Sequence, residues 1–506
     1  MNKNVVYIIG LLMMVTSCSD FLEPKSQSEF VPKNAVSLNE MLLGDAYPQP
    51  NVSSCYLFSL QTMLDDDICC SSLPYTAYQV AQLPGYNALY SWQPDMFYLM
   101  GEANIFYNVW ESYYQFILGA NAALDYIDDM VGTYEEKAIV KAQSYALRAL
   151  YYFNLVNLFG EPYGYNKKAL GVPLKLVSSL TDGFDKQNTV EEVYDQIICD
   201  LDEAEKNFLT LPEEKQYSQT YRINLPAVQL LRARVALHMN NREDAAKYAK
   251  KVIEGWNFSL YDLNSFKGTY NYPYPNFVSF DNPEMVWVMG NSDDVVDLLR
   301  KTFGYLDIST VTPTGKRNAL NVSQDLLKCY KDNDLRVGYY FANDYDKKAI
   351  QGVYVPWGKM KVSYNSAPVK ASEFGYALRL SEAYLILSEA VYDTDEELAL
   401  KLINALREKR YITGTYEEVN YSGDELLNFI REERRRELCF EGQRWFDLRR
   451  YGMPSFKRQW TESGRYVGSY IMEKEDPAYT LPIPAKILDR NPALIQNKLA
   501  IRKTLQ

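Results

Sequence analysis

The densest run of charged side chains lies near the carboxyl end of the chain, at residues 431–452, where the sequence reads REERRRELCFEGQRWFDLRRYG. On a helical projection, Arg434, Glu437, Glu441 and Arg444 fall on one side together with large apolar residues. Their spacings of three, four and three residues place each carboxylate one turn from a guanidinium. The pattern predicts an internally paired ion cluster on a packing face. A solvated charge run broken at Gly442 is the alternative.

Two further groups of side chains could carry chemistry. Asp65, Asp66 and Asp67 form a triple acid that could bind calcium, which prefers oxygen ligands. The triple acid lacks the alternate spacing of an EF-hand loop, so a solvated turn is the competing interpretation, and no other cofactor is expected. His238 is the only histidine, which argues against histidine metal clusters and against Ser-His-Asp or Cys-His catalysis. It ends an apolar run, AVQLLRARVALHM, and is predicted to be structural.

Composition narrows the function classes. The chain has 506 residues, enough for one large domain or two to three smaller ones. Its 65 acidic residues outnumber 53 basic ones, giving a formal net charge of -12. This balance argues against a general nucleic-acid-binding protein. It also disfavours a highly sulfated or uronate-rich ligand, although basic residues such as Arg317, Lys359 and Lys361 could override the net charge locally.

The amino terminus has the form of a secretory signal. Lys3 precedes an apolar run of 11 residues at 5–15, and small residues lead to Cys18. The run is shorter than the roughly 20 residues that a membrane-spanning helix needs. We expect a signal peptide at 1–17, lipidation of Cys18 as in bacterial lipoproteins, and a tether at 18–50. An ordinary cleaved signal with an incidental cysteine is the alternative.

The other cysteines show no zinc-site spacing. Cys55 lies close enough in sequence to Cys69 or Cys70 for a disulfide, which an exported protein would permit. Cys199 and Cys439 fall within helical patterns and are predicted to be small buried residues.

The elements that would position these groups are mostly helices. Apolar periodicity predicts helices at 104–130, 134–159, 189–209, 226–239, 242–255, 374–391, 395–410 and 424–450. Thr189 and Glu192 form a capping box. Paired helices with small residues at crossings are similar to tetratricopeptide units, although no clean period of about 34 residues is visible. Residues 51–93 and 256–372 instead predict loops and short strands, where binding residues tend to lie. We therefore expect a mostly α fold, a tetratricopeptide-like helical-pair scaffold with a large irregular loop and short-strand region inserted.

The charged segment also resembles a known family. RREL-x-FEGQRWFDLRRYG at 435–452 resembles the carboxy-terminal signature of the SusD/RagB family, the surface glycan-binding lipoproteins of Bacteroidetes. Further segments agree with the family pattern: AQSYALRALYYFNLVNLFG (142–160), YALRLSEAYLILSEA (376–390), LALKLINALREKR (398–410) and YTLPIPAKILDRNPALIQN (479–497). The resemblance spans nearly the whole chain and is weakest at 51–95 and 261–371.

The resemblance implies a non-enzymatic protein that captures oligosaccharides and delivers them to a TonB-dependent, SusC-like transporter. Cys18 would anchor it to the outer membrane, facing the extracellular side. Residues 51–506 would form one SusD-like domain. Its helical scaffold would cover about 104–255 and 374–452, and its variable ligand-binding regions about 51–103 and 256–373.

A glycan ligand would need exposed aromatic rings flanked by polar groups. Aromatic faces complement the C–H faces of sugars, and amides, carboxylates and arginines pair with hydroxyls. The segments 75–98, 270–277 and 354–364 supply this combination. The candidate glycan-binding residues are Asn87, Tyr90, Trp92, Tyr272, Tyr274, Tyr354 and Trp357. Trp92 and Trp357 rank first, because a large ring between loop-forming residues has fewer structural reasons to be there. Trp110, Tyr113, Tyr114 and Trp445 are assigned to the core.

Two other function classes stay open. An all-α glycoside hydrolase would need two carboxylates that flank the scissile bond, and no acid here stands in a recognisable catalytic context. A helical repeat scaffold that binds peptides is the second alternative.

Overall fold

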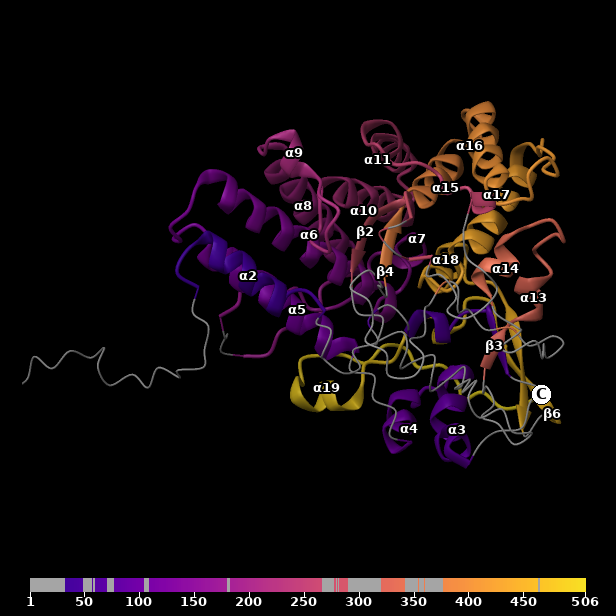
Figure 1. Cartoon of the computed structure of the whole chain (residues 1–506). Helices are drawn as coiled ribbons and strands as arrows, with labels where there is room; N and C mark the ends of the chain where they lie inside the picture. The colour runs from indigo at the N-terminus through magenta and orange to yellow at the C-terminus, as the bar shows by residue number, and fades with distance from the viewer. Residues whose placement is uncertain are drawn as a thin grey trace, which may run out of the picture.

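A computed structural model describes residues 32–48, 57, 60–70, 77–103, 109–179, 183–265, 277–278, 280, 282–289, 320–341, 354, 359, 376–462 and 465–506. Long helices form an arch, and most of the shorter helices and the small sheets lie beneath it, whereas the short helix α9 lies at its top (Figure 1). The predicted mostly α class is confirmed. Within these residues no helix combines the length and the apolar character needed to cross a membrane.

The arch is built from successive helices that pack on their neighbours. Its members are α5 (Val109–Tyr126), α6 (Tyr134–Phe159), α8 (Val190–Leu209), α10 (Leu225–His238), α11 (Arg242–Gly255), α15 (Leu380–Val391), α16 (Glu396–Glu408) and α17 (Gly423–Leu438). Local sequence explains where they begin. Thr133 and Thr189 each accept a hydrogen bond from the amide three residues on, completing the capping boxes of α6 and α8. The predicted capping box at Thr189 is therefore confirmed.

The arch begins earlier than the sequence indicated. Helix α2 (Ala35–Asp45) packs against α5 and α6, and its side chains Ala35, Leu38 and Leu42 are fully buried. The expected tether at 18–50 is therefore wrong for this part. The three apolar residues lie on one face at spacings of three and four, so a short amphipathic helix was present in a polar segment.

Short elements connect the arch to the rest of the chain. They are η2 (Leu60–Met63), α3 (Ala77–Tyr90), α4 (Met96–Glu102), α7 (Tyr163–Asn166), α9 (Glu213–Gln216), η3 (Leu263–Ser265), α13 (Gln324–Leu327), α14 (Arg336–Tyr340), α18 (Arg444–Arg450), η5 (Pro477–Tyr479) and α19 (Ala485–Arg490). Helix α3 corrects the expectation that residues 51–93 form loops and short strands. A proline, Pro84, lies inside α3, and it obscured the helical pattern.

Three antiparallel two-stranded sheets bring distant segments together. They pair β1 (Ile68–Cys70) with β3 (Leu320–Val322), β2 (Met285–Met289) with β4 (Tyr376–Arg379), and β5 (Phe456–Glu462) with β6 (Arg465–Met472). Strand β4 corrects the helix predicted to start at 374, since α15 begins only at Leu380. The cause is not local, because Val288 of the buried strand β2 is paired with Ala377.

The predicted helix at 424–450 is also interrupted. It forms α17 and α18, and between them Phe440 and Gly442 have φ angles of 59° and 73°. Glycine adopts this left-handed conformation readily, whereas phenylalanine does so at a cost. The Phe440 ring is buried and packs edge-on against Phe341, which stabilises the strained residue.

The two burial predictions made for cysteines have opposite outcomes. Cys69, Cys70, Cys199, Cys329 and Cys439 carry free thiols. Cys439 is buried as predicted, but Cys199 is exposed on α8, so the prediction for Cys199 is wrong. Cys55 lies outside the described residues.

Candidate functional site

Trp92, which ranked first among the candidate glycan-binding residues, lies between α3 and α4 and is fully buried. Its indole N–H donates to the carbonyl of Leu64 at 2.8 Å. Its ring packs edge-on against Phe456 and lies 4.5 Å from the Arg458 guanidinium. A ring enclosed in this way cannot stack on a sugar, so the expectation of an exposed platform is wrong for Trp92.

Two neighbours of Trp92 fasten α3 to the β5–β6 hairpin. The hydroxyl of the fully buried Tyr90 donates to the carbonyl of Gln459 at 2.9 Å. The half-buried amide of Asn87 donates to the hydroxyl of Tyr470 at 3.0 Å. Both residues therefore have structural roles, and Tyr90 is enclosed like Trp92.

The remaining candidates divide into two groups. Tyr354 is half-buried, and its carbonyl accepts a hydrogen bond from the amide of Val322 on β3 at 2.9 Å. Trp357, Tyr272, Tyr274 and the lipidation candidate Cys18 lie outside the described residues, and their roles stay predictions.

The charged segment forms a buried ion cluster centred on Glu437 of α17. Its carboxylate accepts hydrogen bonds from Arg336 at 2.9 Å, Arg379 at 2.6 Å and Arg410 at 2.9 Å, and all four side chains are buried. Burial alone would raise the pKa of Glu437, but Arg410, Arg379 and Arg336 hold that pKa well below its usual value. Glu437 is therefore an ionised structural centre.

The pairing inside this cluster differs from the prediction. Arg434 pairs with Asp447 at 2.8 Å, and Arg444 pairs with Asp66 at 2.7 Å. Glu441 accepts instead from Arg379 at 2.9 Å and from Lys359. A packing face is confirmed, but pairing among these four residues is wrong, because each of them has a partner elsewhere. Pairs at helical spacing do form in the same segment, between Arg436 and Glu433 and between Arg450 and Asp447.

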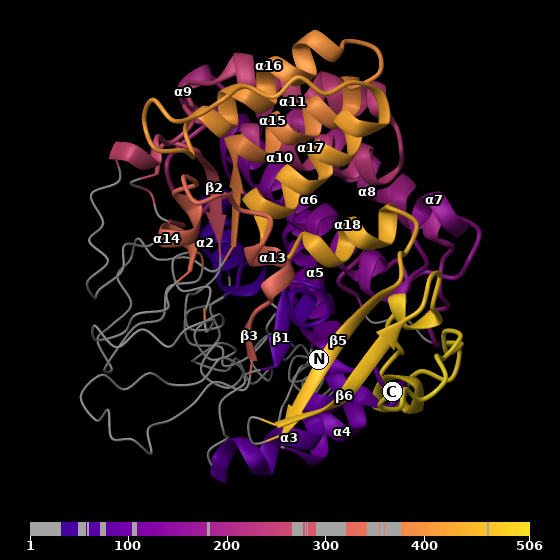
Figure 2. The ribbon, with the colours of Figure 1, turned by 90° about the vertical axis from the view of Figure 1, so that its right-hand side faces the viewer.

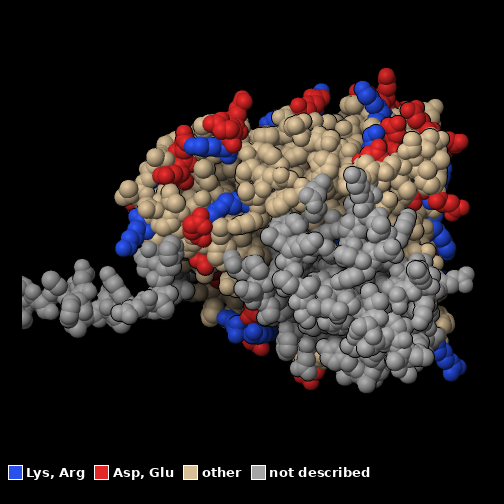
Figure 3. Space-filling view, in the orientation of Figure 1, with Lys and Arg blue, Asp and Glu red and all other residues tan. Residues whose placement is uncertain are grey.

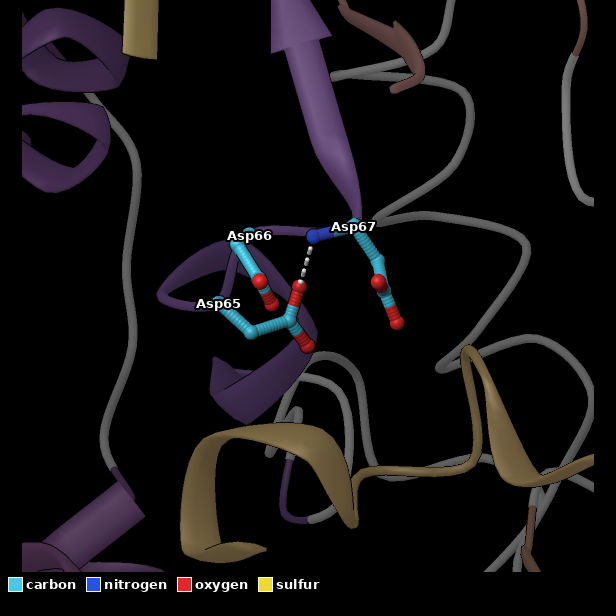
Figure 4. Close-up of side chains that lie close together, drawn as sticks. All are labelled: Asp65, Asp66 and Asp67. Carbon is cyan, nitrogen blue, oxygen red and sulfur yellow. Dashed lines mark hydrogen bonds between the residues drawn. The ribbon is translucent and has the colours of Figure 1, made fainter. Parts of the chain in front are cut away.

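The triple acid faces this cluster. The Asp65 carboxylate accepts a hydrogen bond from the amide of Asp67 at 2.9 Å, and the three carboxylates lie within 4.8 Å of one another (Figure 4). Asp66 and Asp67 form ion pairs with Arg435 at 3.3 and 2.7 Å. The acids are not a solvated turn, since Asp65 and Asp67 are buried. Because guanidinium groups already pair with two of the three acids, the geometry favours ion pairing over calcium binding.

A cleft outside this core combines an exposed aromatic ring with polar side chains. It has a volume of about 420 Å³ and lies between α4, α5 and the segment leading into α19. Tyr98 is 64% exposed at its edge, and Trp110 lies at its wall. Asp95, Glu111 and Gln496 add polar groups: Asp95 pairs with Arg502, Glu111 pairs with Arg490 at 2.9 Å, and the Gln496 amide exchanges hydrogen bonds with the backbone of Ile483. We name this site the aromatic cleft.

Sequence reasoning only partly found the aromatic cleft. Tyr98 ends the candidate segment 75–98, but it was not among the chosen residues. Trp110 was assigned to the core, and it is largely buried yet lines the cleft. The PIPAK run at 482–486 was the sequence feature that could have indicated the aromatic cleft. Its prolines prevent a helix before α19, and the extended segment lines the cleft together with Tyr98.

Two sequence models of one family match this chain. The SusD family model matches residues 311–499, and a SusD-like model described as starch-binding associating with outer membrane matches residues 20–237. The chain belongs to the SusD family. This family is one of carbohydrate-binding proteins associated with the outer membrane. The first match includes the buried ion cluster, and the second includes α2 to α10.

Relatives and solved structures agree with the SusD assignment. Two SusD-like proteins of Formosa agariphila are 24% and 27% identical to the chain, covering 69% and 77% of it and 73% and 79% of their own lengths. A SusD superfamily protein of Bacteroides thetaiotaomicron has a TM-score of 0.67 at 21% identity, covering 92% of this chain and 100% of that one. A laminarin-binding SusD-like protein has a TM-score of 0.63 at 20% identity, covering 92% and 98%. These structures share the fold.

Proposed function

We propose that this SusD-family protein captures oligosaccharides outside the outer membrane, without hydrolysing them, and delivers them to a TonB-dependent, SusC-like transporter. The observation that carries the proposal is the match to the model described as starch-binding over residues 20–237. The shared fold with a laminarin-binding SusD-like protein supports it. In this proposal Cys18 carries the lipid anchor, and the domain faces the extracellular side.

The aromatic cleft is the glycan-contacting surface that we propose within the described residues. Its exposed Tyr98 ring offers a face for a sugar, and nearby carboxylates and amides can accept from or donate to hydroxyls. Trp357, Tyr272, Tyr274 and Tyr354 remain proposed contacts from the variable region. Trp92 and Tyr90 are left out because both side chains are fully buried.

Isothermal titration with laminarin, starch and a panel of other glycans tests the proposal. We expect saturable binding of at least one glycan by the wild type and weaker binding by Tyr98→Ala, by about tenfold if a stacking contact is lost. Tyr126→Ala is the matched control, since Tyr126 is also exposed but does not line the aromatic cleft. Absence of binding to every glycan would contradict the proposed function, whereas equal binding by both variants would remove only the aromatic cleft.

Three further measurements test the absence of hydrolysis, the transporter partner and the lipid anchor separately. Incubation with each bound glycan should release no reducing sugar, which a glycoside hydrolase would release. A tagged full-length chain should co-purify with an outer-membrane transporter, which a free peptide-binding scaffold would not require. Radioactive fatty acid should label the wild type but not Cys18→Ala; absence of label on the wild type would contradict the lipid anchor.

A further inference from the structure

A second pocket opens on the helical arch, away from the aromatic cleft. It has a volume of about 480 Å³ and is lined by residues of α7, α8, α10, α11, α15, α17 and α18. Figure 2 shows α7 beside α18 at the edge of the arch. We name this site the arginine pocket. Its volume is within the range of about 300–1,000 Å³ typical of small-molecule sites.

The charges that line the arginine pocket are unbalanced. The guanidinium groups of Arg242, Arg431, Arg449 and Arg450 all line it, and Glu389 is the one lining carboxylate among the described residues. Arg450 and Arg431 both donate to Glu389, at 2.7 and 3.2 Å. Arg242 also pairs with Asp393 at 2.7 Å and Arg450 with Asp447 at 2.8 Å, although neither acid lines the pocket. Among the described residues, Arg449 is therefore the lining base without an ion pair, and it leaves positive charge at the cavity.

Arg449 is the strongest sign that an anion belongs here. Its side chain is 1% exposed, and its terminal nitrogens donate to the carbonyls of Asn157 and Gly160 at the end of α6. Within the part of the chain that the structure describes, no carboxylate forms an ion pair with it, and its Nε has no hydrogen-bond partner. Burial lowers the pKa of Arg449 to about 10. A buried cation without a paired acid is costly, and a bound anion nearby would lower that cost.

His238 forms another part of the wall of the arginine pocket. His238 is buried between the rings of Phe153 and Phe446, and its Nε2 has no hydrogen-bond partner among the described residues. Its pKa lies well below the usual value because of burial and the charge of Arg450, so the imidazole is neutral and can take part in a hydrogen bond with a hydroxyl.

Aromatic rings make the pocket suitable for more than a bare ion. Tyr163, Tyr165 and Tyr392 line it, and the Arg242 guanidinium lies 4.5 Å from the Tyr392 ring centroid. Aromatic faces complement the C–H faces of a sugar ring, and guanidinium groups pair with a carboxylate. We propose that the arginine pocket binds a sugar that carries a carboxylate, that is, a hexuronate residue. The pocket is locally basic, whereas the net charge of the whole chain is negative.

Calorimetric titration of the full-length protein with sodium glucuronate, glucose and sodium acetate tests this proposal. We expect saturable binding of glucuronate that weakens as salt is added, and affinity at least about tenfold lower for glucose and for acetate. Arg431→Gln and Arg242→Gln should each weaken glucuronate binding by about tenfold. Arg465→Gln is the matched control, because Arg465 is an exposed arginine outside the pocket.

Several outcomes would overturn the proposal. They are no heat with glucuronate, equal affinity for glucose, acetate binding as tight as glucuronate, or unchanged affinity in the double variant Arg242→Gln/Arg431→Gln. Arg431 is partly exposed and Glu389 keeps its pair with Arg450, so the single variant should fold, which thermal unfolding checks. Failure of this proposal can be distinguished from failure of the proposed capture of neutral glycans, because laminarin and starch are titrated in separate experiments.

Discussion

The buried ion cluster and the arginine pocket are made from the same charged segment, yet they differ in how completely charges are paired. Around Glu437, three guanidinium groups surround one carboxylate, and further acids such as Glu284 balance the remaining charge. At the arginine pocket, Arg449 has only carbonyl partners and Glu389 is shared. Elsewhere on the surface, acidic and basic side chains intermingle, as the upper edge of the arch shows in Figure 3. The ion pairs around Glu437 balance one another and serve the fold, whereas Arg449 lies beside a cavity without a paired acid, which is the basis of the proposed anion site.

The largest expected effect comes from breaking the ion cluster. Glu437→Gln removes the charge that compensates three buried guanidinium groups, and it should lower the free energy of unfolding by about 3–5 kcal/mol. Urea denaturation measures this change. Glu432→Gln is the control, since Glu432 is an exposed partner of Arg436 and should contribute below about 1 kcal/mol. Equal effects of the two variants would contradict the structural role of Glu437.

Arg444→Ala should have a slightly smaller effect. It removes the nearer of the two arginine partners of Asp66, in a mostly buried pair, and should lower the free energy of unfolding by about 3 kcal/mol. The folded fraction should bind glycan normally, because Arg444 lines neither the aromatic cleft nor the arginine pocket. A variant that is fully stable but fails to bind would place the charged segment in the glycan site instead.

The pH dependence of stability reports on His238, one of the residues that line the arginine pocket. The folded protein holds the pKa of His238 well below its usual value, so below about pH 6.5 the unfolded chain binds a proton that the folded chain does not. Stability should therefore fall as the pH drops from 7 to 5.5, with a limiting slope of about 1.4 kcal/mol per pH unit. His238 is the only histidine, so His238→Leu should remove this slope. A slope that persists in the variant would assign it to another group.

The smallest expected effect on stability is that of Arg431→Gln. Arg431 is a third exposed and shares Glu389 with Arg450, so its loss should change the free energy of unfolding by less than about 1 kcal/mol. Arg431→Gln should therefore change the affinity for glucuronate more than it changes the stability of the protein. A strongly destabilised Arg431→Gln variant would show that the arginine pocket is an extension of the buried ion cluster.

Local signals explain what the sequence could predict. Helix α6 begins and ends where its capping box and the following Gly160 place it, because caps depend on neighbouring residues. Gly442 offered a place for a break in the charged segment, but the left-handed Phe440 could not be foreseen, because it depends on contact with the distant Phe341. The ion-pair partners of Glu437 could not be predicted either. Arg336 and Arg379 lie in other segments of the chain, and spacing along one helix does not identify such partners.

The candidate glycan site was harder to predict than the fold for a similar reason. Trp92 is flanked by residues typical of exposed loops, but its partners Leu64 and Arg458 lie far away in sequence and enclose it. Tyr98, six residues later, lies on the exposed side of α4. Aromatic composition locates a region rich in candidate rings, whereas the exposure of each ring is decided by tertiary packing.

The ion pair between Asp66 and Arg444 has a consequence for the timing of folding. The two residues are 378 positions apart, so the pair can form only when both ends of the chain are present. Until the carboxyl-terminal segment joins the fold, the early acids lack the arginines that neutralise them. The docking of that segment, rather than the formation of the first helices, therefore completes the core.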